Sequence, residues 1–125
     1  MTGLCLAAGL LLAPLGKEIT LRWTHSIEKV VWEEDYRREN AALRLVEARV
    51  RGTGAGMEPP AGAVLRDGAW HYAPDLPPLP RISLRHSPYV PPYVVCAAAG
   101  CRPLPDWLPG LPAETVVEIA PCPNE

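Results

Sequence analysis

A histidine, a serine and a glutamate lie close together at His25, Ser26 and Glu28, and a second glutamate follows at Glu34. These side-chain types can serve as a general base, a nucleophile and an acid. Successive residues of a strand point to opposite faces of a sheet, so His25 cannot activate Ser26 without a bulge. The chain also lacks the Gly-x-Ser-x-Gly turn that presents a nucleophilic serine. We therefore predict no catalytic residues, and we treat these four residues as a polar cluster with a structural or a binding role.

The polar cluster lies in a segment of alternating polarity. From Ile19 to Ile27, apolar residues and His25 occupy every second position, which is the pattern of a half-buried β-strand. We predict two strands, Thr20–Ile27 and Val31–Arg38, that pair as an antiparallel hairpin, although no Asn-Gly or Asp-Gly marks the turn.

The register of this hairpin determines which side chains meet. With Lys29 and Val30 as the turn, the expected cross-strand pairs are Trp23 with Tyr36, Ile27 with Trp32, and His25 with Glu34. The last pair lies on an apolar face, where an unpaired polar group costs about 1–3 kcal/mol. We therefore expect His25 and Glu34 to hydrogen-bond to each other or to a shared third group, such as the hydroxyl of Tyr36.

A glycine-rich segment contains Gly52, Gly54 and Gly56, with Glu58 just before two prolines. Alternating glycines can turn backbone amides toward an anion, but this spacing matches neither phosphate-binding fingerprint, and no Lys-Ser or Lys-Thr follows. The segment therefore predicts a sharp structural loop. The alternative function that the sequence leaves open is a small-ligand-binding domain or an enzyme that uses the histidine–glutamate cluster beside this loop.

The four cysteines, Cys5, Cys96, Cys101 and Cys122, allow three disulfide pairings. Their spacing is not that of a zinc site, and nothing in the spacing of the three histidines brings them to one metal. We predict no metal and no cofactor. An even number of cysteines favours disulfides in an exported protein, whereas buried thiols are expected in a cytosolic one.

The segment Glu39–Arg51 is compatible with two structures. Its content of Ala, Leu, Glu and Arg favours a helix. Its apolar residues also alternate as in a strand, with one slip of phase between Leu45 and Val46 that a β-bulge would explain. We favour the strand, because the flanking segments are strands and tertiary context overrides weak propensity.

Short strands recur along the rest of the chain. They are expected at 4–6, 10–12, 63–65, 69–72, 81–87, 93–96 and 115–119, with turns at Ala8-Gly9 and Asp67-Gly68. The proline-rich segment between Pro74 and Pro92 excludes helix. We predict a single all-β domain over residues 1–125, an antiparallel β-sandwich or barrel of about eight to ten short strands.

The net charge of −2 and the scattered basic residues argue against nucleic-acid binding. The segment Leu4–Leu15 is apolar, but no Lys or Arg precedes it, and about 12 residues cannot span a bilayer. We therefore predict buried strands here and no membrane insertion. Either an export signal is missing from this sequence or the protein is not exported.

Three stretches of the chain resemble a known family. They are Leu21-Arg22-Trp23-Thr24-His25-Ser26-Ile27-Glu28, Trp32-Glu33-Glu34-Asp35-Tyr36 and Gly54-Ala55-Gly56-Met57-Glu58-Pro59. They are similar to the motifs of the bacterial and archaeal domain of unknown function numbered eighteen-fifty, to which no activity is assigned. Members of that family are often encoded beside, or fused to, permeases of tripartite ATP-independent periplasmic transporters. The resemblance therefore implies an extracytoplasmic accessory domain.

Together these observations lead us to expect a small, non-enzymatic accessory or protein-interaction domain. Its expected partner is a membrane transport component, and its expected location is periplasmic or otherwise extracytoplasmic. If no export signal is missing, a cytoplasmic location is expected instead. The sequence carries no signal for a particular oligomeric state.

Overall fold

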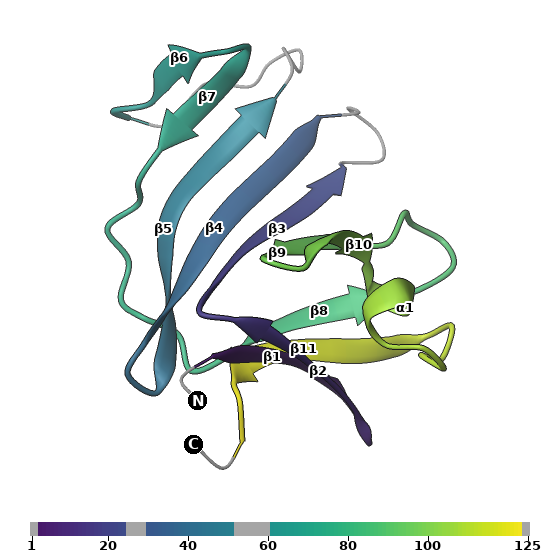
Figure 1. Cartoon of the computed structure of the whole chain (residues 1–125). Helices are drawn as coiled ribbons and strands as arrows, with labels where there is room; N and C mark the ends of the chain where they lie inside the picture. Colours follow the sequence, from purple (N-terminus) through teal and green to yellow (C-terminus); the bar gives the residue numbers. More distant parts are fainter. Residues whose placement is uncertain (1–2, 25–29, 52–60, 124–125) are drawn as a thin grey trace.

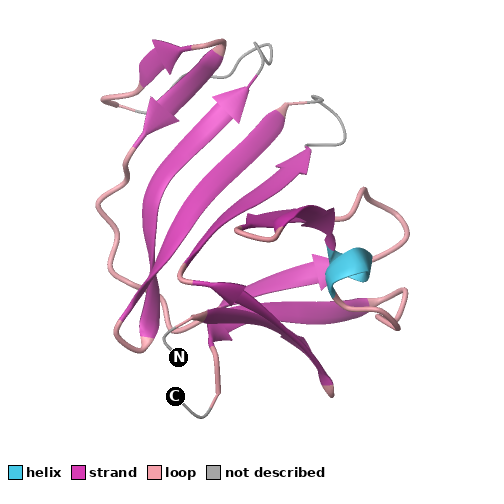
Figure 2. Ribbon diagram, viewed as in Figure 1, coloured by secondary structure: helices cyan, strands magenta, loops and turns pink. Residues whose placement is uncertain are grey.

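The computed structural model describes residues 3–24, 30–51 and 61–123. In this part of the chain it contains eleven β-strands and one four-residue helix, which confirms the predicted all-β class (Figures 1 and 2). The first strands are β1 (Leu4–Ala8), β2 (Leu11–Gly16), β3 (Glu18–Thr24), β4 (Val31–Glu39) and β5 (Ala42–Arg51). They are followed by β6 (Val64–Arg66), β7 (Ala69–Tyr72), β8 (Ile82–His86), β9 (Val94–Ala97), β10 (Gly100–Pro103), α1 (Leu104–Trp107) and β11 (Thr115–Pro121).

The strands form two antiparallel sheets. The small sheet has the order β2-β1-β11-β8, and the large sheet has the order β10-β9-β3-β4-β5-β7-β6. Neither order closes on itself, so the fold resembles a sandwich and not a barrel. Strand β1 pairs with β11, which brings the first and last strands of the chain side by side (Figure 1).

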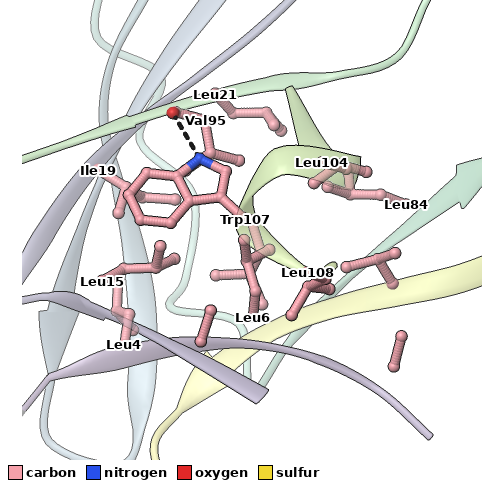
Figure 3. Close-up of a cluster of buried hydrophobic side chains, with 14 of the residues drawn as sticks. Leu4, Leu6, Leu15, Ile19, Leu21, Leu84, Val95, Leu104, Trp107 and Leu108 are labelled. Atoms are coloured by element: carbon pink, nitrogen blue, oxygen red, sulfur yellow. Dashed lines mark hydrogen bonds between the residues drawn. The ribbon is translucent and has the colours of Figure 1, made fainter. Parts of the chain in front are cut away.

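The hydrophobic core lies between the two sheets and beneath α1. The small sheet contributes Leu6 and Ile119, and the large sheet contributes Leu21, all of them buried. The short helix adds Trp107, whose indole Nε1 donates a hydrogen bond of 3.0 Å to the carbonyl oxygen of Val95 (Figure 3). This bond satisfies the polar atom that a tryptophan brings into an apolar core.

The β1–β2 hairpin forms where the sequence predicts it, with Gly9 in the left-handed region at φ 59°. The expectation that both of its leucine runs are buried is only half right. Leu10 is fully exposed at the turn and Leu12 is 53% exposed, while β2 faces the core with Ala13 and Leu15. Successive residues of β2 alternate between the core face and the outer face, so Leu12 points away from the core that Ala13 and Leu15 enter.

The predicted β3–β4 hairpin is present, but its register is different. Trp23 pairs with Trp32 and not with Tyr36, a shift of four residues, and Glu34 pairs with Leu21. The expected pairs of Ile27 with Trp32 and of His25 with Glu34 are therefore wrong.

The physical reason is that alternation does not encode the length of a turn. A shift by an even number of residues keeps every side chain on its predicted face. The observed register stacks Trp23 on Trp32, and pairing ends at Thr24 and Val31. A tight turn at Lys29-Val30 would instead need residues that adopt positive φ.

Strand β5 confirms the predicted strand and its bulge. Asp35 pairs with Glu47 and Tyr36 pairs with Leu45, so Val46 is the extra residue on β5. The bulge returns the apolar residues to the inner face after the phase slips.

The remaining predicted strands are also present. Asp67 and Gly68 both have positive φ in the β6–β7 turn, as the Asp-Gly signal predicts. Residues 74–92 contain no helix, and β8 is the one named strand within them.

Candidate functional site

On the outer face of the large sheet, three arginines converge on Glu33. The Nε atoms of Arg22, Arg51 and Arg49 lie 3.1, 3.0 and 3.4 Å from its carboxylate oxygens. Glu33 is only 5% exposed. Burial alone would raise the pKa of Glu33, but the bonds from these arginines hold it below its ordinary value.

Asp35 lies on the same outer face and is held in a similar way. Arg49 donates two bonds to it, Nη1 to Oδ2 at 2.7 Å and Nη2 to Oδ1 at 2.8 Å, and the Thr20 hydroxyl donates a third at 2.7 Å. Burial opposes ionisation, yet these bonds lower the pKa of Asp35. Arg49 Nη1 also reaches Glu47 at 2.7 Å.

This outer network links three strands of the large sheet through ion pairs. The carboxylates of Glu33, Asp35 and Glu47 are each paired with at least one arginine. The pairs connect β3, β4 and β5, so they fix the register of the central strands.

The inner face carries a different arrangement around Glu34. This residue lies between Leu21 and Ala48 on the neighbouring strands, both of which are buried. The Tyr36 hydroxyl donates a hydrogen bond of 2.9 Å to Glu34 Oε1. Among the described residues, no basic side chain forms an ion pair with this carboxylate.

Burial changes the acidity of both members of this pair. It raises the pKa of Glu34, and the bond from Tyr36 only partly opposes the effect. The pKa of Tyr36 is raised strongly, first by burial and then by the nearby carboxylate. The charge of Glu34 also adds to the effect of burial in raising the pKa of Tyr72.

Four large aromatic side chains share the inner face of the large sheet with Glu34. Trp23 stacks on Trp32 with ring centroids 6.2 Å apart and planes only 7° from parallel. Farther along the sheet, Trp70 follows Val50 in the row of Trp32, and Tyr72 follows Ala48 in the row of Glu34. We call the surface formed by Trp23, Trp32, Glu34, Trp70 and Tyr72 the aromatic face.

The aromatic face lies on the part of the large sheet that extends beyond the small sheet. In Figure 1, β3, β4, β5 and the β6–β7 hairpin rise away from the layer formed by β1, β2, β8 and β11. All five residues of the face are partly exposed, whereas Ile19 and Tyr36, farther down the same strands, are buried in the main core. The aromatic face therefore continues the core-facing surface of the large sheet into a region that the small sheet does not cover.

Most of the predicted polar cluster lies outside the described residues. This applies to His25, Ser26 and Glu28, and it applies equally to Gly52, Gly54, Gly56 and Glu58 of the glycine-rich segment. The strand ends that border these segments, Thr24, Val31 and Arg51, are neighbours in one row of the large sheet.

Alternation correctly places Glu34 on the face of Trp32 and Tyr36. Our sequence reasoning did not include Trp70 and Tyr72 in this site. The signal was available, because the two aromatic residues are separated by one position, as on one face of a strand.

The two histidines that the structure describes do not converge. His71 is in β7 of the large sheet, where Nδ1 lies 3.4 Å from Glu47 Oε1, and His86 is in β8 of the small sheet. Within the described ranges, no group of three or more His, Cys, Asp or Glu residues is arranged to hold a metal ion.

A cleft lies at the opposite end of the β3–β4 hairpin. Its lining includes Lys17, Arg37 and Asp35. Asp35 is already bonded to Arg49 and Thr20 as part of the outer network.

All four cysteines form disulfides, as the even count favoured. Cys5 pairs with Cys122, and Cys96 pairs with Cys101 across the β9–β10 hairpin. Two disulfides in a chain of this size indicate an oxidising, extracytoplasmic environment. None of the described helices is long and apolar enough to cross a membrane.

A family model described as Domain of unknown function (DUF1850) matches residues 19–104. The chain belongs to this family. The DUF1850 match includes β3 to β10, and therefore both the outer arginine network and the aromatic face. Strands β1, β2 and β11 lie outside it. No curated protein and no solved structure matches the chain.

Proposed function

We propose that this DUF1850 domain is a non-enzymatic, extracytoplasmic accessory domain that binds a protein through its aromatic face. The proposed partner is a component of a tripartite ATP-independent periplasmic transport system. The main observation that supports this proposal is the aromatic face, where three tryptophans and a tyrosine remain partly exposed beyond the small sheet. Tryptophan and tyrosine are enriched at the centres of protein interfaces, where they supply much of the binding energy.

The chemistry of the face favours binding over catalysis. Glu34 of the face accepts a hydrogen bond from Tyr36 in the adjoining core, and burial raises the pKa of Tyr36 further above its already high ordinary value. A phenol that holds its proton so firmly does not act as a nucleophile near neutral pH. The pair is better suited to fixing the position of the Glu34 carboxylate.

The compartment and the partner have separate support. The two disulfides support an oxidising location. The link to a transport component rests on the motif resemblance, because DUF1850 members are often encoded beside permeases of that class.

Co-purification tests the proposal. A tagged chain would be recovered from membranes of the native organism in mild detergent, with the neighbouring permease as the candidate. We expect the permease to be recovered with the wild type and lost with Trp70→Ala, since truncating an interface tryptophan commonly costs about 2 kcal/mol or more.

The matched control is Tyr89→Ala, which removes an aromatic side chain that is 83% exposed and not part of the aromatic face. This variant should recover the permease as the wild type does. Circular dichroism would establish that each variant is folded. Recovery of no membrane component by the wild type, or equal recovery by a folded Trp70→Ala variant, would contradict the proposal.

A further inference from the structure

Glu34 differs from the neighbouring carboxylates in forming no ion pair with any basic residue that the structure describes. On the outer face, Glu33, Asp35 and Glu47 are each bonded by arginine. On the inner face, Glu34 accepts a bond from the neutral Tyr36 hydroxyl, and no ion pair joins it to the described basic residues. Within the described part of the chain, the aromatic face therefore presents an anionic group without a complementary charge.

We infer that the protein partner presents an arginine side chain to this face, with its guanidinium paired with Glu34 and stacked on the tryptophans. This inference rests on the proposed function and names the chemistry that the partner must supply. The charge of Glu34 and the apolar character of its surroundings are the two properties that select the occupant.

The geometry suits a planar cation. The Tyr36 hydroxyl occupies Oε1 of Glu34, and no described residue bonds to Oε2. Trp32 precedes Glu34 by two positions on the same strand, so both side chains project from the same face of the sheet. A guanidinium can donate to a carboxylate and stack on an aromatic ring at the same time, whereas an ammonium is a compact and strongly hydrated charge.

The same molecule already contains one such contact. The guanidinium carbon of Arg102 lies 4.6 Å from the ring centroid of Trp107. A guanidinium therefore packs on tryptophan elsewhere in this fold, and no described carboxylate forms an ion pair with Arg102. The aromatic face adds Glu34 to the tryptophan, which should strengthen the contact.

A short ligand tests the chemistry without the partner. The chain would be titrated with N-acetyl-arginine amide and with N-acetyl-citrulline amide, which has a similar planar end group but no charge. Tryptophan fluorescence would report binding. We expect the arginine compound to bind about tenfold more tightly, the ratio that one charge-assisted contact supplies.

Two variants locate the effect. Glu34→Gln keeps the shape of the side chain and removes its charge, so the preference for arginine should disappear. Glu118→Gln removes the same charge from a 43% exposed side chain on the small sheet and should leave the preference intact. Equal binding of both compounds by the wild type, or an unchanged preference in Glu34→Gln, overturns the inference.

Other occupants give different results. Equal affinity for tetramethylammonium and for the arginine compound would identify a general organic-cation site and overturn the choice of arginine. A concentration-dependent dimer that Glu34→Gln abolishes would identify a second copy of the chain as the occupant and would also overturn it.

Co-purification separates this inference from the proposed function. If Glu34→Gln recovers the permease at the wild-type level, the arginine contact is wrong and the proposed function stands. If the wild type recovers no permease, the proposed function fails. In that case the ligand titration decides the further inference. A preference for the arginine compound that depends on Glu34 supports the inferred contact, and the lack of such a preference overturns the contact as well.

Discussion

Glu33 and Glu34 are adjacent in sequence, but their carboxylates lie on opposite faces of the large sheet in opposite electrostatic surroundings. Glu33 accepts bonds from three arginines, whereas Glu34 accepts one from the Tyr36 hydroxyl among aromatic side chains. The pKa of Glu33 is lowered and that of Glu34 is raised. The first carboxylate is stabilised in its ionised form by the fold, and the second is destabilised in that form.

The two glutamates should therefore respond differently to the same substitution. Glu33→Gln removes the charge on which three guanidinium groups converge, and we expect it to lower the free energy of unfolding by about 1–3 kcal/mol. Glu34→Gln removes a desolvated charge and should change that free energy by less than about 1 kcal/mol. Urea denaturation at neutral pH measures both. A Glu34→Gln variant that loses as much stability as Glu33→Gln would contradict this account.

Acid should destabilise the protein through the outer network. Glu33 and Asp35 have lowered pKa values, so the folded state binds fewer protons than the unfolded state. Their contribution is complete above the ordinary carboxyl pKa and is lost as the pH falls through the folded values. As the pH is lowered from about 6 to about 3, we expect the urea midpoint of the wild type to decrease. The decrease should be smaller in Glu33→Gln.

Glu34 should act in the opposite direction. Its pKa is raised, so its contribution is present below the ordinary value and is lost as the pH rises through the folded one. Removing this titration by Glu34→Gln should make the loss of stability on acidification larger than in the wild type. Urea midpoints measured over the same pH range test this expectation. A smaller loss of stability on acidification in Glu34→Gln than in the wild type would contradict the raised pKa of Glu34.

The two disulfides should contribute unequally to stability. The Cys5–Cys122 bond joins residues 117 positions apart, and the Cys96–Cys101 bond joins residues 5 positions apart. Loop-closure entropy gives about 5 kcal/mol for the first and about 2 kcal/mol for the second. Thermal melting of the two double serine variants should show the larger loss for the first. Thiol titration of the denatured wild type, without reductant, should find no free thiol.

Deletion of Val46 should be tolerated. Without this residue the β5 sequence alternates regularly, and Leu45 and Glu47 become adjacent opposite Tyr36 and Asp35, their present partners. We expect a folded protein whose stability is within about 1 kcal/mol of the wild type, because no buried side chain changes face. Deletion of Arg44 is the control, since it moves Leu43 out of the core. Equal damage by both deletions in thermal melts would refute the bulge argument.

Alternation predicted much of this fold because it reports which face a residue occupies. It placed Glu34 beside Tyr36 and located the bulge near Val46, since each conclusion needs only the phase of the pattern. It failed for the β3–β4 register, because Trp23 remains on its face whether it pairs with Trp32 or with Tyr36. Which cysteines pair depends on how distant strands meet, and spacing alone does not contain that information.

The aromatic face also could not be predicted from local alternation alone. Its rows are assembled from β3, β4, β5 and β7, and the last of these joins the sheet after a long interruption in sequence. A local pattern identifies Trp70 and Tyr72 as residues on one face of a strand. That this face continues the one carrying Glu34 follows only from the order of strands in the sheet.

The Cys5–Cys122 bond also determines how the domain responds to mechanical force. Tension applied to the chain before Cys5 and after Cys122 passes through this single covalent link, because the bond closes the loop that contains almost all of both sheets. The strands inside the loop are then not stretched, and under oxidising conditions the domain transmits a pull without unfolding. After reduction, the same pull would act on the hydrogen bonds between β1 and β11 and could peel these strands apart.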